Sequence, residues 1–271
     1  MSDFDLDAYF ARIGYGGPVE PTLETLTAIH ALQVAAIPFE NLDPLLGRPV
    51  NLDIAPLQAK LVGSRRGGYC FELNALFKAA LETLGYTVTG LAARPRWMAP
   101  PDAPLSSRTH MLLKVALPDG LYLADAGFGA QLLDAPLKLQ AGVDQSTAWG
   151  EWRLTHAEGA LSLAVRLPDD WQPVYIFTHE PQHPADYEMG SWFTATRPQS
   201  LFVNNLLAER LTDAFRYNLV NHKLTERARG GSAMTHTLTS AAELGEVLDK
   251  LFDIEPPEPI EAVFAKLPPA A

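Results

Sequence analysis

The only cysteine of the 271-residue chain, Cys70, lies in the segment Arg66-Gly67-Gly68-Tyr69-Cys70-Phe71-Glu72. Paired glycines permit tight turns or the close approach of another group, and an apolar helical pattern starts at the cysteine. The N–H groups and dipole at a helix start favour a thiolate. The segment therefore predicts a nucleophilic cysteine, with a small buried structural thiol as the alternative.

A nucleophilic cysteine needs a base and a group that orients the base. His110 precedes one apolar strand pattern and Asp125 lies in the next, across the turn signal Pro118-Asp119-Gly120. If Leu112 pairs with Asp125, then His110 and Asp125 are diagonal neighbours on one face. A slip of one residue places them on opposite faces, and the sequence leaves this register open. An unpaired aspartate inside an apolar strand is costly, so we expect Asp125 to have a buried partner.

The first third of the chain has helical patterns that can position the cysteine. Capping and terminating residues predict three helices: Leu6 to Ile13 between Asp5 and Gly14, about Thr22 towards Ala35 with a stop before Pro38, and a stripe from Leu73 to Leu84 that starts at Cys70 and ends at Gly85.

From Tyr86 onwards short strands replace the helices. Turn signals at Asp119-Gly120 and Glu158-Gly159 separate strand pairs, and the predicted strands are 86–91, 111–117, 121–126, 152–155, 161–167 and 174–178. This pattern is typical of a mostly antiparallel sheet or barrel.

The last third mixes both types of element. Residues 215–227 and 234–238 can pair across Gly230-Gly231, and a final helix begins at Ser240, where Glu243 completes a capping box. We expect the proline-rich tail from Pro256 to be loosely held.

The charge and composition exclude several classes of function. A net charge of -11 argues against nucleic acid and against an anionic membrane surface as partners. Locally, however, Arg65, Arg66, Arg94, Arg96 and Arg108 lie within 40 residues of the cysteine. One cysteine cannot form an internal disulfide or a multi-thiolate metal site. The HExxH match from His179 to His183 contains Pro181, which argues against the helix that zinc binding requires, so we expect no metal. The acidic N-terminus lacks the features of a signal peptide, and we expect a cytoplasmic protein.

Together the motifs resemble the arylamine N-acetyltransferases. The likeness rests on residues 66–72, Thr109-His110, residues 125–129 (DAGFG) and residues 38–42 (PFENL), in the family's order and spacing. It is strongest over residues 25 to 130. The resemblance implies an α+β fold with an N-terminal helical bundle (1–86), a central antiparallel β-barrel (87–195) and a C-terminal α/β lid (196–271), in which Cys70, His110 and Asp125 form a triad like that of cysteine proteinases.

The resemblance also implies an activity and its ligands. Acetyl-CoA would acetylate Cys70, and an aromatic amine, hydrazine or hydroxylamine would then take the acetyl group. The implied acceptor-site residues are Phe39, Tyr69, Phe128 and Phe202, and the implied CoA-site residues are Ser106, Thr109, Gly127 and Gly129. Arg66 is expected to pair with Glu40 and to hold the cysteine loop.

Three other functions are open at this point. A CoA-independent amide synthase of the same family would share the triad. A thiol hydrolase of papain or transglutaminase type would share its chemistry, and a binding protein could keep the fold without activity.

Overall fold

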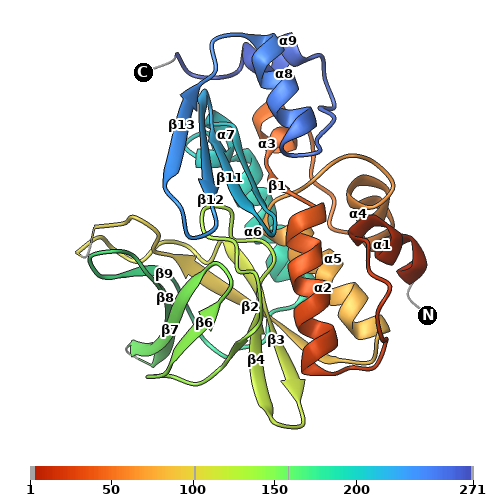
Figure 1. Cartoon of the computed structure of the whole chain (residues 1–271), viewed down its shortest axis with the longest axis vertical. Helices are drawn as coiled ribbons and strands as arrows, with labels where there is room; N and C mark the ends of the chain where they lie inside the picture. Colours follow the sequence, from red (N-terminus) through yellow and green to blue (C-terminus); the bar gives the residue numbers. More distant parts are fainter. Residues whose placement is uncertain (1–3, 101, 158, 270–271) are drawn as a thin grey trace.

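The computed structural model describes residues 4–100, 102–157 and 159–269. Its helices, a barrel-like sheet and a second sheet follow one another along the chain (Figure 1). The predicted α+β class, with helices, barrel and α/β lid in that order, is confirmed. The domain limits at residues 86 and 195 stay a prediction.

Helices form most of the N-terminal part: α1 (Leu6–Ile13), α2 (Leu23–Ala36), α3 (Leu42–Leu46), α4 (Ile54–Leu61) and α5 (Cys70–Thr83). Asp5 accepts a hydrogen bond from the Ala8 amide and caps α1, and Thr22 caps α2 in the same way. The three predicted helices are therefore confirmed. The sequence reading missed α3 and α4, which are short and contain proline.

The barrel-like sheet has eight antiparallel strands in the order β5-β4-β3-β2-β9-β8-β7-β6. Their bounds are β2 (Thr87–Pro95), β3 (His110–Leu117), β4 (Gly120–Ala124), β5 (Leu137–Lys138), β6 (Asp144–Thr147), β7 (Gly150–Ala157), β8 (Ala160–Arg166) and β9 (Trp171–Phe177). The side chain of Gln145 bonds both the amide and the carbonyl of Lys138, which joins the two edge strands. The sheet is thus nearly closed. Of the predicted turn Glu158-Gly159, Glu158 lies outside the described residues.

The second sheet has the order β1-β10-β11-β12-β13 and combines distant parts of the chain. Its strands are β1 (Phe39–Glu40), β10 (Leu207–Leu211), β11 (Phe215–Val220), β12 (Lys223–Ala228) and β13 (Ala233–Thr237), and the accompanying helices are α6 (Pro184–Thr196), α7 (Leu201–Asn204), α8 (Ala241–Lys250) and α9 (Ile260–Phe264). Strands β12 and β13 pair across the two glycines as predicted. Residues 215–227 are two strands, because Asn221 makes a turn with φ 53°.

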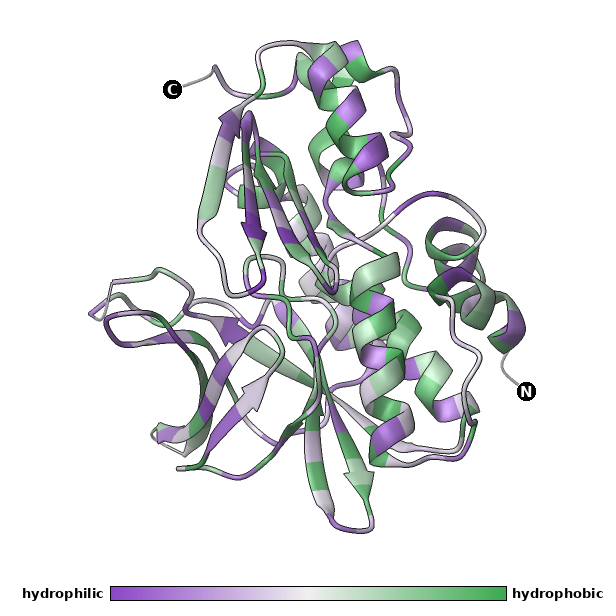
Figure 2. Ribbon diagram, in the orientation of Figure 1, coloured by the Kyte–Doolittle hydropathy of each residue, from purple (hydrophilic) through white to green (hydrophobic). Residues whose placement is uncertain are grey.

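Residues 256–269 of the tail pack against the rest of the protein, so the expectation of a loosely held tail was wrong for them, and α8 is followed by α9. Val263 of α9 is fully buried, and the carbonyl of Pro268 accepts a hydrogen bond from His222. Apolar residues from the tail complete a core with α8, in which Leu244 and Leu248 point inward. Figure 2 shows hydrophilic and hydrophobic residues alternating around α8, as expected for a helix with one buried face.

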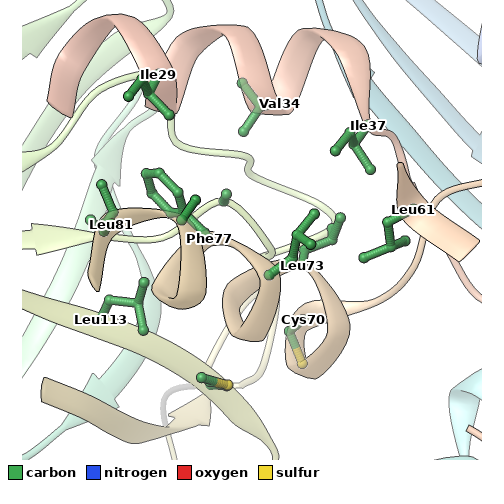
Figure 3. Close-up of a cluster of buried hydrophobic side chains, with 14 of the residues drawn as sticks. Ile29, Val34, Ile37, Leu61, Cys70, Leu73, Phe77, Leu81 and Leu113 are labelled. Carbon is green, nitrogen blue, oxygen red and sulfur yellow. The ribbon is translucent and has the colours of Figure 1, made fainter. Parts of the chain in front are cut away.

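A large core lies between α2 and α5. Ile29, Val34 and Phe77 are buried to at least 99%, and their side chains meet in the space between the two helices (Figure 3). Truncation of such a phenylalanine to alanine typically costs about 3–5 kcal/mol. This packing fixes the start of α5, where the sulfur of Cys70 points away from α2 (Figure 3).

Candidate active site

Cys70 is the first residue of α5 and is 4% exposed. Its Sγ lies 3.6 Å from the carbonyl oxygen of Thr109, to which the thiol can donate. Glu72 accepts the backbone N–H of Tyr69 at 3.1 Å and caps the helix. The predicted place of the cysteine at a helix start is confirmed, and the N–H groups of this first turn favour the thiolate.

His110 begins β3, Asp125 directly follows the neighbouring strand β4, and the two side chains form a close pair. Leu113 pairs with Ala124 in the ladder between β3 and β4, which is the register that places the two side chains on one face. Nε2 of His110 is 2.7 Å from Oδ2 of Asp125, and both side chains are at least 97% buried. The predicted partner of the buried aspartate is therefore this histidine.

The electrostatics of the pair favour a protonated imidazole. Burial lowers the pKa of His110, but the carboxylate of Asp125 and a hydrogen bond with Cys70 outweigh it and raise the pKa to about 10. Burial raises the pKa of Asp125, but His110 outweighs it and the pKa is lowered. Since Nε2 is taken by Asp125, Nδ1 is the ring nitrogen that remains for the thiol. The geometry therefore supports a thiolate–imidazolium pair oriented by a carboxylate.

Two further polar residues support Asp125, and the sequence reading missed both. Asn74 of α5 donates to Oδ1 of Asp125 at 2.9 Å and to the carbonyl of Met111 at 2.7 Å. His30 of α2 is fully buried and donates from Nε2 to the carbonyl of Asp125 at 3.1 Å. Burial lowers the pKa of His30, so it remains neutral. These residues fix the aspartate from two helices.

Tyr175 of β9 completes the wall behind the histidine. Its ring lies 5.0 Å from that of His110 and 5.3 Å from that of Phe128. Burial, and then the nearby carboxylate of Asp125, raise the pKa of Tyr175. Phe128 itself stands edge-on to His110 at 4.9 Å. The apolar rings exclude water from the imidazole, which strengthens its interaction with Asp125.

Three of the predicted acceptor residues, Phe39, Tyr69 and Phe202, form one aromatic group, whereas Phe128 packs against His110 and Tyr175. Phe39 lies 6.2 Å from Phe202 and lines a cleft of about 400 Å³ together with Gly129 and Glu209. Tyr69 is fully buried, and its ring packs against Phe202 while its hydroxyl bonds Ser191. Phe39 is thus placed where a ligand can reach it, whereas Tyr69 is a packing residue in this structure. A role of Phe128 at the acceptor site stays a prediction.

The predicted CoA residues fall into two groups. Thr109 lines a cleft of about 490 Å³ with Arg94 and Arg108, and the hydroxyl of Ser106 donates to the carbonyl of Pro95. Thr109 lies beside the cysteine, and its cleft is lined by the two arginines and by Asp186. A role of Ser106 in CoA binding stays a prediction.

The structure explains in another way why positions 127 and 129 are glycines. A Cβ on Gly127 would lie 2.8 Å from the Cα of Cys70, and one on Gly129 would lie 2.3 Å from the ring of Phe39. Both glycines are needed for packing between protein groups, and a role of either in CoA binding stays a prediction.

The predicted pair of Arg66 and Glu40 is confirmed. Nε of Arg66 lies 2.7 Å from Oε1 of Glu40, and both side chains are at least 90% buried. The amide of Glu40 also donates to the carbonyl of Gly68 at 2.9 Å. The cysteine loop is therefore tied to β1 by an ion pair and by a backbone hydrogen bond.

The HExxH match has no helical geometry. His183 is the N-cap of α6, and His179 lies before that helix, so the two rings do not share a helix face. Among the described residues, three or more acidic, histidine or cysteine side chains never gather as a metal site. None of the described helices has both the length and the apolar character of a membrane span.

The site matches known proteins over nearly the whole chain. A family model described as N-acetyltransferase matches residues 22–258. The arylamine N-acetyltransferase of Mycolicibacterium smegmatis is 45% identical over 254 residues, which cover 93% of this chain and 92% of that protein. This chain belongs to the arylamine N-acetyltransferase family. The expected family and enzyme class, an acyltransferase, are thereby confirmed.

Two other arylamine N-acetyltransferases are similar over most of their length. The Salmonella typhimurium protein, named arylamine N-acetyltransferase / N-hydroxyarylamine O-acetyltransferase, is 40% identical over 94% of this chain and 90% of its own. The Mycobacterium marinum enzyme, solved in complex with CoA, has a TM-score of 0.92 and 41% identity, and the match covers 97% of this chain and 98% of that chain. The CoA complex supports the expectation that this arylamine N-acetyltransferase uses CoA.

Proposed function

We propose that this protein transfers the acetyl group of acetyl-CoA to the nitrogen of arylamines or arylhydrazines, or to arylhydroxylamines, through an acetyl-Cys70 intermediate. The convergence of Cys70, His110 and Asp125 carries the proposal, because a thiolate beside a carboxylate-supported imidazolium is a nucleophile at neutral pH. The relatives' names support the arylamine and arylhydroxylamine classes, the CoA complex supports CoA as the carrier, and the hydrazine class is implied by the family resemblance. A lone cysteine that must stay reduced fits the cytoplasm.

The first half-reaction needs an attacking thiolate and a proton for the leaving thiolate. The sulfur of Cys70 attacks the thioester carbonyl, and the bond between that carbon and the sulfur of CoA breaks. His110, protonated and supported by Asp125, can give its proton to the departing CoA thiolate. The enzyme is left acetylated on Cys70, with a neutral imidazole.

The second half-reaction uses that neutral imidazole as a base. The acceptor nitrogen attacks the acetyl-Cys70 carbonyl, His110 takes the proton of the nitrogen, and Cys70 leaves as a thiolate. We place the acceptor ring against Phe39 and Phe202, whose rings pack together, and against Phe128, which stands edge-on to the histidine. CoA is placed at Ser106 and Thr109, where Arg94 and Arg108 supply local positive charge to an acidic protein.

Mixing enzyme with acetyl-CoA in the absence of an amine tests the proposal. A burst of free CoA equal to the enzyme concentration is expected, with acetylated Cys70 seen by mass spectrometry. Cys70→Ser should lose the burst, because a hydroxyl is a far weaker nucleophile than a thiolate at neutral pH.

The same experiment separates the alternatives. Absence of a burst contradicts the proposal. A CoA-independent amide synthase would release no CoA, and a thiol hydrolase would cleave peptide substrates instead.

A further inference from the structure

A network of buried charges lies beneath the loop that carries Cys70, and we call its five members the charge cluster: Glu40, Asp43, Lys60, Arg66 and Glu72. Arg66 joins Glu40 to Asp43, at 2.7 and 3.2 Å. Lys60 of α4 joins Asp43 to Glu72, at 2.6 and 2.7 Å. The ammonium of Lys60 therefore connects the part of the cluster before the cysteine with the part after it.

Glu72 brings the cluster to the first turn of α5. One carboxylate oxygen binds Lys60, and the other accepts the N–H of Tyr69, the residue before the nucleophile. The Glu72 side chain is 2% exposed. A change in the charge or position of Glu72 therefore alters the electrostatic environment and the capping of the first turn of α5.

The cluster holds three carboxylates and two buried cations, and the half-exposed Arg48 reaches Asp43 from outside at 3.4 Å. Lys60 is the cation that pairs with Glu72. Burial raises the pKa of Glu72, and Lys60 is the largest effect that opposes this rise. Burial lowers the pKa of Lys60, but the three carboxylates outweigh it, so the ammonium keeps its proton. Loss of Lys60 would leave the charge of Glu72 without this partner, and negative charge near a thiol disfavours the thiolate.

We propose that Lys60 is a positioning residue for the nucleophile: it neutralises Glu72 and holds that carboxylate against the N–H of Tyr69, so that the first turn of α5 supports the Cys70 thiolate. This inference rests on the proposed role of Cys70. Lys60 touches none of the triad residues in the contacts of the described chain, and it acts through Glu72.

Alkylation of Cys70 by iodoacetamide between pH 4 and pH 9 tests the inference, because the thiolate is the reacting form. In the wild type we expect rapid alkylation already at pH 6. In Lys60→Met the profile should move to higher pH by about one unit, which is about tenfold slower alkylation on the rising part of the profile, below its midpoint. Lys60→Arg retains the charge and should stay within about threefold of wild type.

A second substitution tests whether charge is the cause. Glutamine at position 72 can still accept the N–H of Tyr69 but carries no charge. Glu72→Gln alone should alkylate at least as fast as wild type, and Lys60→Met combined with Glu72→Gln should recover the wild-type profile. If Lys60 only supports packing, its loss should be as harmful in the Glu72→Gln background.

Lys78→Met is the matched control, since Lys78 lies on the outer side of α5 and pairs with Glu82 at the surface. Its alkylation profile should equal that of the wild type. An unshifted profile in Lys60→Met, or a shift that persists in the double variant, overturns the inference.

Two other results of the alkylation experiment, a variant that does not fold and an unreactive Cys70, can be told apart. If Lys60→Met does not fold, the double variant decides: wild-type alkylation supports the inference, and failure to fold or a tenfold loss contradicts it. A wild-type enzyme that reacts only above pH 8 contradicts the proposed nucleophile itself, which distinguishes the two failures.

Discussion

The carboxylate of Asp125 is held on both of its oxygens: Oδ2 faces Nε2 of His110 at 2.7 Å, while Oδ1 accepts from Asn74 at 2.9 Å and from the amide of Gly127 at 3.0 Å. With its acceptor sites used in this way, the carboxylate cannot rotate without losing a bond to the helix or to its own loop. The imidazole is therefore oriented by a group that is itself fixed.

Asp125→Asn should abolish most of the activity. The carbonyl oxygen of asparagine would keep the bonds from Asn74 and Gly127, so its NH2 group would face His110. Nε2 must then accept a hydrogen bond, and Nδ1 carries the proton that it should receive from the thiol. In a related triad this type of change lowers kcat by about 10⁴-fold.

Steady-state acetylation of a small arylamine measures the loss, with Asp119→Asn in an exposed turn as the control. Less than tenfold loss in Asp125→Asn would contradict the tautomer argument.

Stability should depend on pH through His110. Its pKa is about 10 in the folded protein and about 6.5 in an unfolded chain. A raised pKa means that the stabilisation is fully present below pH 6.5 and is lost as pH rises towards 10. The difference in free energy of unfolding between wild type and His110→Gln, measured with urea, should therefore shrink from pH 6 to pH 10.

Cys70→Ala is the control for this pH effect. Asp125 is the largest cause that raises the pKa, so most of the dependence should remain without the thiol. A difference that grows with pH would show that the imidazole is neutral in the folded protein.

Arg66→Ala should lower stability together with activity. Glu40 and Arg66 are at least 90% buried, and removal of one partner of a buried pair typically costs about 3–5 kcal/mol. Urea denaturation measures this cost, and Arg48→Ala is a matched control, because the Arg48 side chain is itself about half-exposed where it pairs with Asp43 and Glu258. An unchanged stability with a raised KM for acetyl-CoA would instead assign Arg66 to ligand binding.

Gly129→Ala should disturb the acceptor wall. The added Cβ would lie 2.3 Å from the ring of Phe39, so the ring must move. We expect a lower Tm and a raised KM for the arylamine, with the CoA burst retained. Combining it with Phe39→Leu should recover part of the Tm. Gly150→Ala is the control, since its Cβ would make only ordinary contacts. An equal loss of Tm in both variants would show that displacement of Phe39 is not the cause.

Arg108→Ala should weaken acetyl-CoA binding if phosphate groups approach the cleft beside Thr109. The protein is acidic overall, so attraction of a polyanion depends on local cations, and salt screens it. The KM for acetyl-CoA should rise with salt in the wild type and rise less steeply in Arg108→Ala. A wild-type KM for acetyl-CoA that does not change with salt would show that charge does not contribute to acetyl-CoA binding.

Local signals predicted much of the fold correctly. Caps such as Asp5 and Thr22 and the glycine-containing turns mark elements within a few residues, so α1, α2, α5 and most barrel strands were found. The elements that were missed are short or depend on distant partners. Strand β1 has two residues and exists because it pairs with β10, and α9 is a single short turn whose Val263 is buried only by the helix before it.

In the candidate site, too, features with a local sequence signal were predicted and features that depend on distant residues were not. The triad was recognisable because its residue types and motifs are distinctive, whereas the register between β3 and β4 was left open and required the structure. Asn74 and His30 carry no local signature. Their roles come from hydrogen bonds to Asp125, which lies far away in the chain and belongs to another element.

The pairing of Phe39 with Glu209 also bears on how the enzyme is made. During synthesis from the N-terminus, β1 has no sheet to join until β10 has left the ribosome, and such non-local pairings form late and slowly. The helices and strands that bring Cys70, His110 and Asp125 together are complete before that point. A nascent chain can therefore assemble its nucleophile while the Phe39 wall is still missing, which leaves a reactive thiol open to oxidants until the last third of the chain arrives.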